Sequence, residues 1–481
     1  MPIVFSLISH TNAGKTTLLR TLLRQDVGEV EDRAHVTVEA KCYPLIEAPD
    51  GEALHLWDTP GFGSNLSKLA SRIRQEANPI GWFLHQVWDR HRDASLYHSQ
   101  TALRNVRDHA DVVVYVIDVS QKPEQVGYID AEMEILGLMK RPVIVALNQT
   151  GQPDPESARA REDEIRQLMQ RHPVARHVVT LDAFTRCWVQ EHRLLDLATG
   201  LLEDRGRRAA AARLVSAWRE SQLAVFRDSA ARLARLLAES ATDSEALSQT
   251  NLLGRLRQLV DRKARDAEFD RLQQAMYERL RQRTEAALND LITRHGIDGA
   301  TARQFAETAR EEFTATGGRV DEIIASIGGG AVSGLLGGVA LDLASHGISF
   351  GSGAAIGAIL GGATSYALAR GYNLTQGDSQ TVRWTEAHFR DEIRFCLLLY
   401  LAVAHFGRGR GRWQDAAEDP DHWSKIVAAV VDRHQDTVAG FWKRGRSESA
   451  ATLADRYEKS VEIWLRECLT ALYPESAAVF A

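Results

Sequence analysis

The chain has 481 residues, of which 44% are hydrophobic and 25% are charged, and its formal net charge is −6 at pH 7. This length exceeds what one hydrophobic core normally serves, so two or three domains are expected. The negative net charge excludes a protein that is basic throughout. The four cysteines are too scattered for a disulfide framework or a metal site, and no signal peptide precedes the first apolar run, so we expect a cytoplasmic protein.

The first segment of the chain carries a phosphate-binding pattern. An apolar run at 3–9 leads into Ser9-His10-Thr11-Asn12-Ala13-Gly14-Lys15-Thr16-Thr17, and a helical pattern covers 15–24. A strand, a loop of small residues and Gly-Lys-Thr at a helix start are typical of a P-loop, whose backbone N–H groups bind phosphate. Lys15 is expected to contact the β- and γ-phosphates, and the Thr16 hydroxyl to bind Mg²⁺. The predicted phosphate-binding residues are Asn12, Ala13, Gly14, Lys15, Thr16 and Thr17.

Further apolar runs alternate with helical stretches along the first 200 residues. Such alternation is typical of an α/β domain with a mostly parallel sheet, here of six strands. The other predicted strands are 41–47, 53–57, 111–118, 142–148 and 176–181, and the other predicted helices are 124–139, 155–171 and 186–203. A long segment before 111 carries Trp82 and Trp88 on one helical face, which favours a helical insertion there, although such a stripe is more often core.

The third predicted strand ends in Asp58-Thr59-Pro60-Gly61. Asp58 is suited to hold a Mg²⁺-bound water, and Gly61 lets a backbone N–H approach the γ-phosphate. Thr37 is the only threonine of segment 26–40, and we expect it to close on Mg²⁺ and the γ-phosphate; a solvated loop threonine is the alternative. The expected metal-binding residues are therefore Thr16, Thr37 and Asp58.

These motifs resemble the GTPases of the Era and TrmE branch over roughly residues 1–200. The shared pattern is Asn-x-Gly-Lys-Ser/Thr, then Asp-Thr-Pro-Gly, then a base loop that contains asparagine. The resemblance implies GTP and GDP as ligands with Mg²⁺, and base contacts from Asn148, Gln149 and Ala183. The family usually ends its fifth strand in Asn-Lys-x-Asp, whereas this chain has Asn148-Gln149-Thr150-Gly151. Gly151 stands where the family has the aspartate that hydrogen-bonds guanine. The residues of this loop therefore do not decide whether the nucleotide base is guanine or adenine.

Phe62 follows Gly61, at the position where Ras-like enzymes carry the glutamine that orients the attacking water. A phenyl ring cannot orient water, so hydrolysis must use other groups. The resemblance implies that Asn12 helps to coordinate K⁺, and local capping of the loop is the alternative role. The expected catalytic residues are Lys15, Asn12, Thr37 and Gly61. We expect slow turnover, accelerated by a partner or by homodimerisation through the GTPase domain.

From Arg207 onward the pattern changes to long amphipathic helices, with apolar residues at three- and four-residue steps through 245–290 and helical stretches at 384–406, 421–436 and 450–472. The sequence therefore predicts a GTPase domain over 1–204 and an all-helical domain over 205–481. The arginines near 207 are expected to lie on a solvated helix face, and nucleic acid is not an expected partner.

Two uncharged arms, 323–341 and 347–369, have glycines four residues apart. On helices these glycines form stripes that let another backbone approach closely, so 323–369 is predicted to be a glycine-zipper hairpin. Both arms approach the length needed to span a bilayer. Two interpretations stay open: contact with the inner membrane, peripheral or integral, or burial as the core of a soluble helical domain.

The sequence thus predicts a GTP-binding, slowly hydrolysing switch that drives a helical, membrane-associating effector domain. One alternative is a soluble assembly or RNA-associated GTPase with the hairpin as buried core, and another is a nucleotide-binding module with negligible hydrolysis. A helical domain after an Era-like GTPase resembles bacterial proteins that carry a domain of unknown function, and that resemblance does not supply an effector role.

Overall fold

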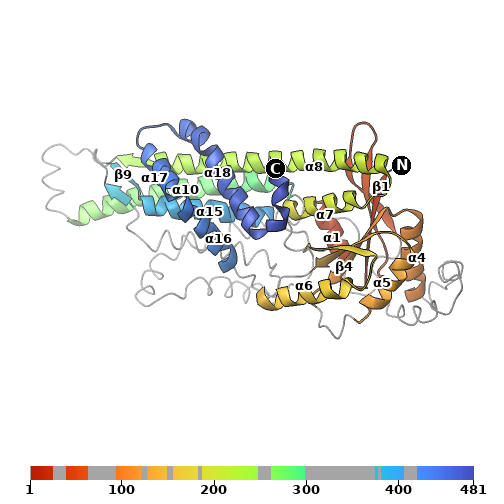
Figure 1. The fold of residues 1–481 in the computed structure, drawn as a ribbon. Coiled ribbons are helices and arrows are strands. Elements are labelled where there is room, and N and C mark those ends of the chain that lie inside the picture. Colours follow the sequence, from red (N-terminus) through yellow and green to blue (C-terminus); the bar gives the residue numbers. More distant parts are fainter. Residues whose placement is uncertain are drawn as a thin grey trace, which may run out of the picture. The chain divides into compact units, whose positions relative to one another are not determined.

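The computed structural model describes ten stretches of the chain: 2–24, 40–62, 94–120, 127–148, 155–181, 187–246, 262–297, 374–376, 381–405 and 420–481. The chain divides into two compact units, which are described separately (Figure 1). The first unit comprises Met1–Gln222, His405–Glu418 and Ser476–Ala481, and the second comprises Leu223–Ala404 and Asp419–Glu475.

The first unit is built on a six-stranded sheet with strand order β2-β3-β1-β4-β5-β6. The strands are β1 (Ile3–Ser9), β2 (Lys41–Glu47), β3 (Ala53–Asp58), β4 (Val112–Asp118), β5 (Val143–Asn148) and β6 (Ala175–Thr180). All neighbouring pairs are parallel except β2 and β3. Every residue of β1, β4 and β5 is buried, because helices cover both faces of the sheet and the strands are mostly apolar. All six predicted strands are confirmed, with ends shifted by one residue or less.

Two apolar clusters cover the two faces of this sheet. The helices are α1 (Lys15–Leu23), α4 (Ala94–Asp108), α5 (Ile129–Leu138), α6 (Pro155–Met169) and α7 (Trp188–Gly200). Helices α4, α5 and α6 pack on the face that carries Val113, Tyr115 and Ile117, whereas α1 and α7 pack on the opposite face. Four of these helices match predicted ones; α4 was not predicted, and the expected insertion helix around Trp82 and Trp88 lies outside the described residues.

One edge of the sheet is formed by β2, which carries Pro44. Its antiparallel register with β3 shifts between Pro44 and Ile46. Proline has no backbone N–H, so strands tolerate it at sheet edges and bulges, which is where it lies here.

The second unit is largely helical, as predicted. Its helices are α10 (Arg262–Arg294), α15 (Glu386–Ala404), α16 (Pro420–Arg433), α17 (Gln435–Arg444) and α18 (Ala450–Leu472), together with the later part of α8 (Arg205–Thr242); the short 3₁₀ helix η2 (Pro474–Phe480) follows α18. A three-stranded antiparallel sheet, in the order β7 (Ser244–Ala246), β9 (Thr381–Trp384) and β8 (Leu374–Gln376), is an addition to the predicted all-helical pattern. Strands of three or four residues are too short to leave a periodic signal in the sequence.

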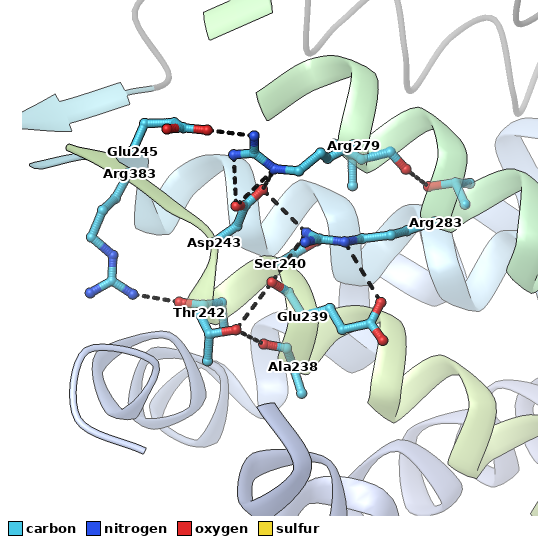
Figure 2. Close-up of polar contacts among 12 residues, drawn as sticks. Ala238, Glu239, Ser240, Thr242, Asp243, Glu245, Arg279, Arg283 and Arg383 are labelled. Atoms are coloured by element: carbon cyan, nitrogen blue, oxygen red, sulfur yellow. Dashed lines mark hydrogen bonds and ion pairs between the residues drawn. The ribbon is translucent and has the colours of Figure 1, made fainter. Parts of the chain in front are cut away.

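An arginine cluster closes the carboxyl end of α8 in this unit (Figure 2). Asp243 accepts hydrogen bonds from Arg279 (2.9 Å from Nη2 to Oδ1) and from Arg283 (3.2 Å from Nη1 to Oδ2). Arg383 of β9 donates to the carbonyl of Ala241 at 2.5 Å. The last carbonyls of a helix have no partner within the helix and carry partial negative charge, so cations are favoured here. The cluster thereby joins α8, α10 and β9.

The predicted glycine-zipper hairpin at 323–369 lies outside the described residues. Of the helices in the described part of the chain, none has both the length and the hydropathy needed to cross a bilayer.

Candidate nucleotide-binding site

The loop between β1 and α1 turns through two residues with left-handed backbone conformation, Asn12 (φ 67°) and Gly14 (φ 79°). Glycine adopts this conformation without steric cost, and asparagine tolerates it better than most residues. Gly14 is the N-cap residue of α1. Because glycine has no side chain, no capping side chain accepts a hydrogen bond from the N–H groups of the first turn. A helix start of this kind, at the carboxyl end of a buried strand, is suited to an anion.

Three polar side chains meet beside this loop. The ammonium group of Lys15 contacts Oδ1 of Asp58, and the Thr16 hydroxyl donates to Oδ2 of Asp58 at 3.0 Å. Lys15 and Asp58 are only 6% and 2% exposed. A carboxylate and a hydroxyl side by side supply the hard oxygen ligands that Mg²⁺ prefers, and the lysine adds a mobile counter-charge for phosphate. These residues therefore fit a Mg²⁺-bound phosphate group.

The segment after Asp58 is docked on the P-loop. The Phe62 N–H donates to the Ser9 carbonyl at 2.8 Å, and the Thr11 N–H donates to the Phe62 carbonyl at 3.1 Å. A Cβ atom on Gly61 would lie 3.0 Å from the Cα of Thr11, closer than side chains normally approach backbone. Glycine at 61 thus permits the close approach, and the fully buried Phe62 ring belongs to the apolar core.

Asn148 links the end of β5 to the same loop. Its side chain is buried, and Nδ2 donates to the carbonyl of Ala13 at 3.0 Å. The backbone carbonyl of Asn148 accepts from the Val119 N–H at 3.0 Å, which ties β5 to the end of β4. The asparagine of the predicted base loop therefore supports the P-loop directly.

Most of the predicted site residues come together at the carboxyl ends of β1, β3 and β5. These residues are Asn12, Ala13, Gly14, Lys15, Thr16, Thr17, Asp58, Gly61 and Asn148. Thr37, Gln149 and Ala183 lie outside the described residues, so their roles stay predictions.

Sequence reasoning missed a polar cluster next to the P-loop. Nδ1 of His10 lies 2.7 Å from Oε1 of Glu132, and the Tyr115 hydroxyl donates to the other oxygen of that carboxylate. The His10 ring stacks on Tyr128, with centroids 4.0 Å apart. Burial raises the pKa of Glu132, and the hydrogen bonds from His10 and Tyr115 offset part of the rise. The available signal was Glu132, an acid next to Met133 and one turn from Leu136 and Ile129 in helix 129–138, and its partner is not apparent from the sequence.

Comparison with known proteins gives two family matches. Residues 5–149 match the model of the 50S ribosome-binding GTPase family, and residues 171–462 match the model described as a domain of unknown function, DUF3482. No curated protein is similar enough to this chain to be matched.

Solved structures of GTPases match part of the chain. A structure of Era with MgGDPNP and a 16S ribosomal RNA fragment is 19% identical over 38% of this chain and 51% of that chain, with a TM-score of 0.27. An Era variant from Aquifex aeolicus, bound to GDP and AlF4⁻, is 20% identical over 38% of this chain and 51% of that chain, with a TM-score of 0.26. The G domain of the T. maritima FeoB iron transporter is 22% identical over 38% of this chain and 88% of that chain, with a TM-score of 0.22. The match thus spans about half the length of the Era chains.

The two family models cover consecutive parts of the chain. The first contains the P-loop, the Asp58 segment and Asn148, and so agrees with the geometry of the site. The second covers more than half of the 481 residues. The chain therefore belongs to the DUF3482 family, and it joins this domain to a preceding P-loop GTPase domain.

Proposed function

We propose that this protein is a GTP-binding molecular switch that hydrolyses GTP slowly and is coupled to its DUF3482 domain. The observation that carries the proposal is the convergence of Lys15, Thr16 and Asp58 at the start of α1. The GTPase family match supports guanine nucleotides as the ligands. The boundary between the domains is proposed at residues 204 and 205, where α8 begins, although the two compact units divide further along this helix, between Gln222 and Leu223.

In the proposed site, Thr16, Thr37 and Asp58 would hold Mg²⁺. When bound, Mg²⁺ supplies counter-charge to the β- and γ-phosphates. Lys15, which contacts Asp58 in the structure, would exchange this partner for phosphate oxygens. The Gly61 N–H is the proposed donor to the γ-phosphate, and Gln149 and Ala183 are the proposed further base contacts.

Slow hydrolysis is proposed because a buried phenylalanine occupies position 62. The side chain that orients water in Ras-like enzymes is thus replaced by one without a polar atom. We propose that Asn12 holds K⁺ near the phosphates, and that homodimerisation through the GTPase domain accelerates turnover. The left-handed conformation of Asn12 is compatible with this role, because it lies at the turn of the P-loop.

Titration of the purified protein with GTP, GDP and ATP, in K⁺ and in Na⁺ buffers, tests the proposal. GTP and GDP are expected to bind at least about tenfold more tightly than ATP. GTP turnover is expected to be faster in K⁺ than in Na⁺, and Asn12→Ala is expected to abolish this difference while GDP affinity stays within about threefold. Preferred binding of ATP would contradict the switch proposal, and binding without measurable turnover would favour the nucleotide-binding module.

The proposed effector action is contact with the inner membrane, peripheral or integral, through residues 323–369, with the rest of the protein in the cytoplasm. Support comes from the length of the two arms and from their lack of charged residues. The full chain is expected to float with liposomes of bacterial lipids, more strongly with a non-hydrolysable GTP analogue than with GDP. A chain that stays unbound in both states would contradict membrane contact. Co-purifying RNA with strongly salt-dependent affinity would favour the soluble, RNA-associated alternative.

A further inference from the structure

His10 lies where three elements of the GTPase domain meet. Its backbone forms a parallel bridge with Phe62, and the flanking hydrogen bonds run between Ser9, Thr11 and Phe62. Its imidazole reaches in another direction, to Glu132 on α5. One residue thus joins the P-loop to the segment that contains Gly61 and to α5.

The imidazole is held from two sides. Glu132 is fully buried, and its two carboxylate oxygens bind His10 Nδ1 and the Tyr115 hydroxyl. The Tyr128 ring covers the imidazole face, with an interplanar angle of 17°. Burying a carboxylate among apolar side chains is costly, and an apolar pair of similar volume would hold the helix at least as well. What the polar arrangement adds is a defined direction for the His10 side chain, and hence for the backbone on either side of it.

Backbone position matters more at this site than in enzymes with an orienting glutamine. Phe62 contributes no polar side-chain atom, so of residues 61 and 62 the Gly61 N–H is the proposed donor to a γ-phosphate. Its place depends on the two hydrogen bonds that flank His10. A displacement of about 1 Å in such a group can reduce a rate on the order of 100-fold.

We propose that His10, anchored by Glu132 and Tyr128, is a positioning residue that fixes the Gly61–Phe62 segment against the P-loop for GTP hydrolysis. This inference rests on the proposed function. His10 acts through the backbone of its neighbours, so its loss affects the chemical step more than nucleotide binding.

The test compares His10→Ala, His10→Asn and the control His172→Ala. Asparagine places an amide nitrogen near the position of Nδ1 and can still donate to Glu132. His172 also pairs with an acid of α5, Asp130, at 2.7 Å, so its variant reports the general cost of losing a histidine contact to this helix. For His10→Ala, kcat is expected to fall about 10- to 100-fold while KM for GTP stays within about threefold. His10→Asn is expected to recover most of the rate, and His172→Ala to retain it.

A second measurement, amide hydrogen exchange, tests the role of His10 without depending on GTP hydrolysis. Amide hydrogen exchange of Thr11 and Phe62 is expected to quicken in nucleotide-free His10→Ala and to stay at the wild-type level in His172→Ala. A wild-type protein that does not bind or hydrolyse GTP would refute the proposed function, while the exchange result would still decide whether His10 holds this segment. Unchanged exchange at both amides would overturn the inference. So would a His10→Ala variant whose GTP affinity falls as much as its kcat, because that result indicates general destabilisation.

Discussion

Lys15→Ala is expected to weaken GTP binding at least about 100-fold, which corresponds to about 3 kcal/mol or more. Lys15 is buried in contact with Asp58, and the same ammonium group is the proposed counter-charge for the β- and γ-phosphates. Its removal would leave a buried carboxylate facing a highly charged anion. Both the lost attraction and the unmatched repulsion act against the triphosphate.

The control for this experiment is Lys41→Ala. Lys41 lies on β2 opposite Asp58 in the strand register, and its side chain is exposed. Affinity would be measured by titration with a fluorescent GTP analogue, and thermal unfolding would establish that both variants are folded. Lys41→Ala is expected to bind as the wild type does. If Lys15→Ala is folded and binds GTP with unchanged affinity, the site has been assigned to the wrong residues.

Glu392→Gln is expected to remove a pH-dependent loss of stability from the second unit. Glu392 lies on α15, buried, with Oε1 accepting a hydrogen bond of 2.5 Å from the Ser240 hydroxyl. Burial raises the pKa of Glu392 from 4.5 to about 8; the Ser240 hydrogen bond and the charge of Arg283 lower it in part, and Asp243 raises it further.

The sign of the effect follows from proton release. Between pH 4.5 and about 8 the unfolded chain loses the Glu392 proton while the folded chain retains it. The free energy of unfolding therefore falls as pH rises through this window, by on the order of 5 kcal/mol. His388, one turn earlier on α15, acts in the opposite direction, since burial lowers its pKa from 6.5 to about 4 and stability falls as pH drops through that interval. Between pH 4.5 and 6.5 these two contributions offset each other, and above pH 6.5 only the Glu392 decline remains.

Urea unfolding of the full chain between pH 5 and 9, followed by tryptophan fluorescence, would measure both effects. Glutamine has the same shape as glutamate and carries no charge, so Glu392→Gln should lose most of the decline above pH 6.5. His388→Gln is the matched variant, because it removes the contribution that opposes Glu392: its stability should decline already between pH 5 and 6.5, while the decline above pH 6.5 stays as in the wild type. If Glu392→Gln keeps the wild-type slope between pH 6.5 and 8, then Glu392 is not protonated in the folded protein at neutral pH.

The central strands β1, β4 and β5 could be predicted because each is a nearly continuous apolar run between turn signals. The P-loop and the Asp58 segment could be predicted because their residue types have fixed spacing. The pair of His10 and Glu132 could not, since the two residues are 122 positions apart and meet only through the packing of α5. The sequence indicated Asn148 as a base contact, and it could not reveal that this side chain donates to the carbonyl of Ala13.

The second unit was predicted less completely for a different reason. Helices α15, α16 and α18 have strong apolar periodicity, and their ranges agree closely with the predicted ones. Strands β7, β8 and β9 have three or four residues each, and are held by partners distant in the chain rather than by local preference. The arginine cluster follows from these pairings, because Arg383 reaches Ala241 only once β9 lies beside β7.

Pro44 also bears on how two copies of this protein can meet. Edge strands such as β2 are the usual template for extending a sheet into a neighbouring molecule. Pro44 has no backbone N–H, and the pairing register of β2 with β3 shifts between Pro44 and Ile46. An incoming strand would find an incomplete row of hydrogen-bonding groups. The β2 edge is therefore a poor template for open-ended aggregation, and a proposed dimer that extended the sheet through β2 is disfavoured.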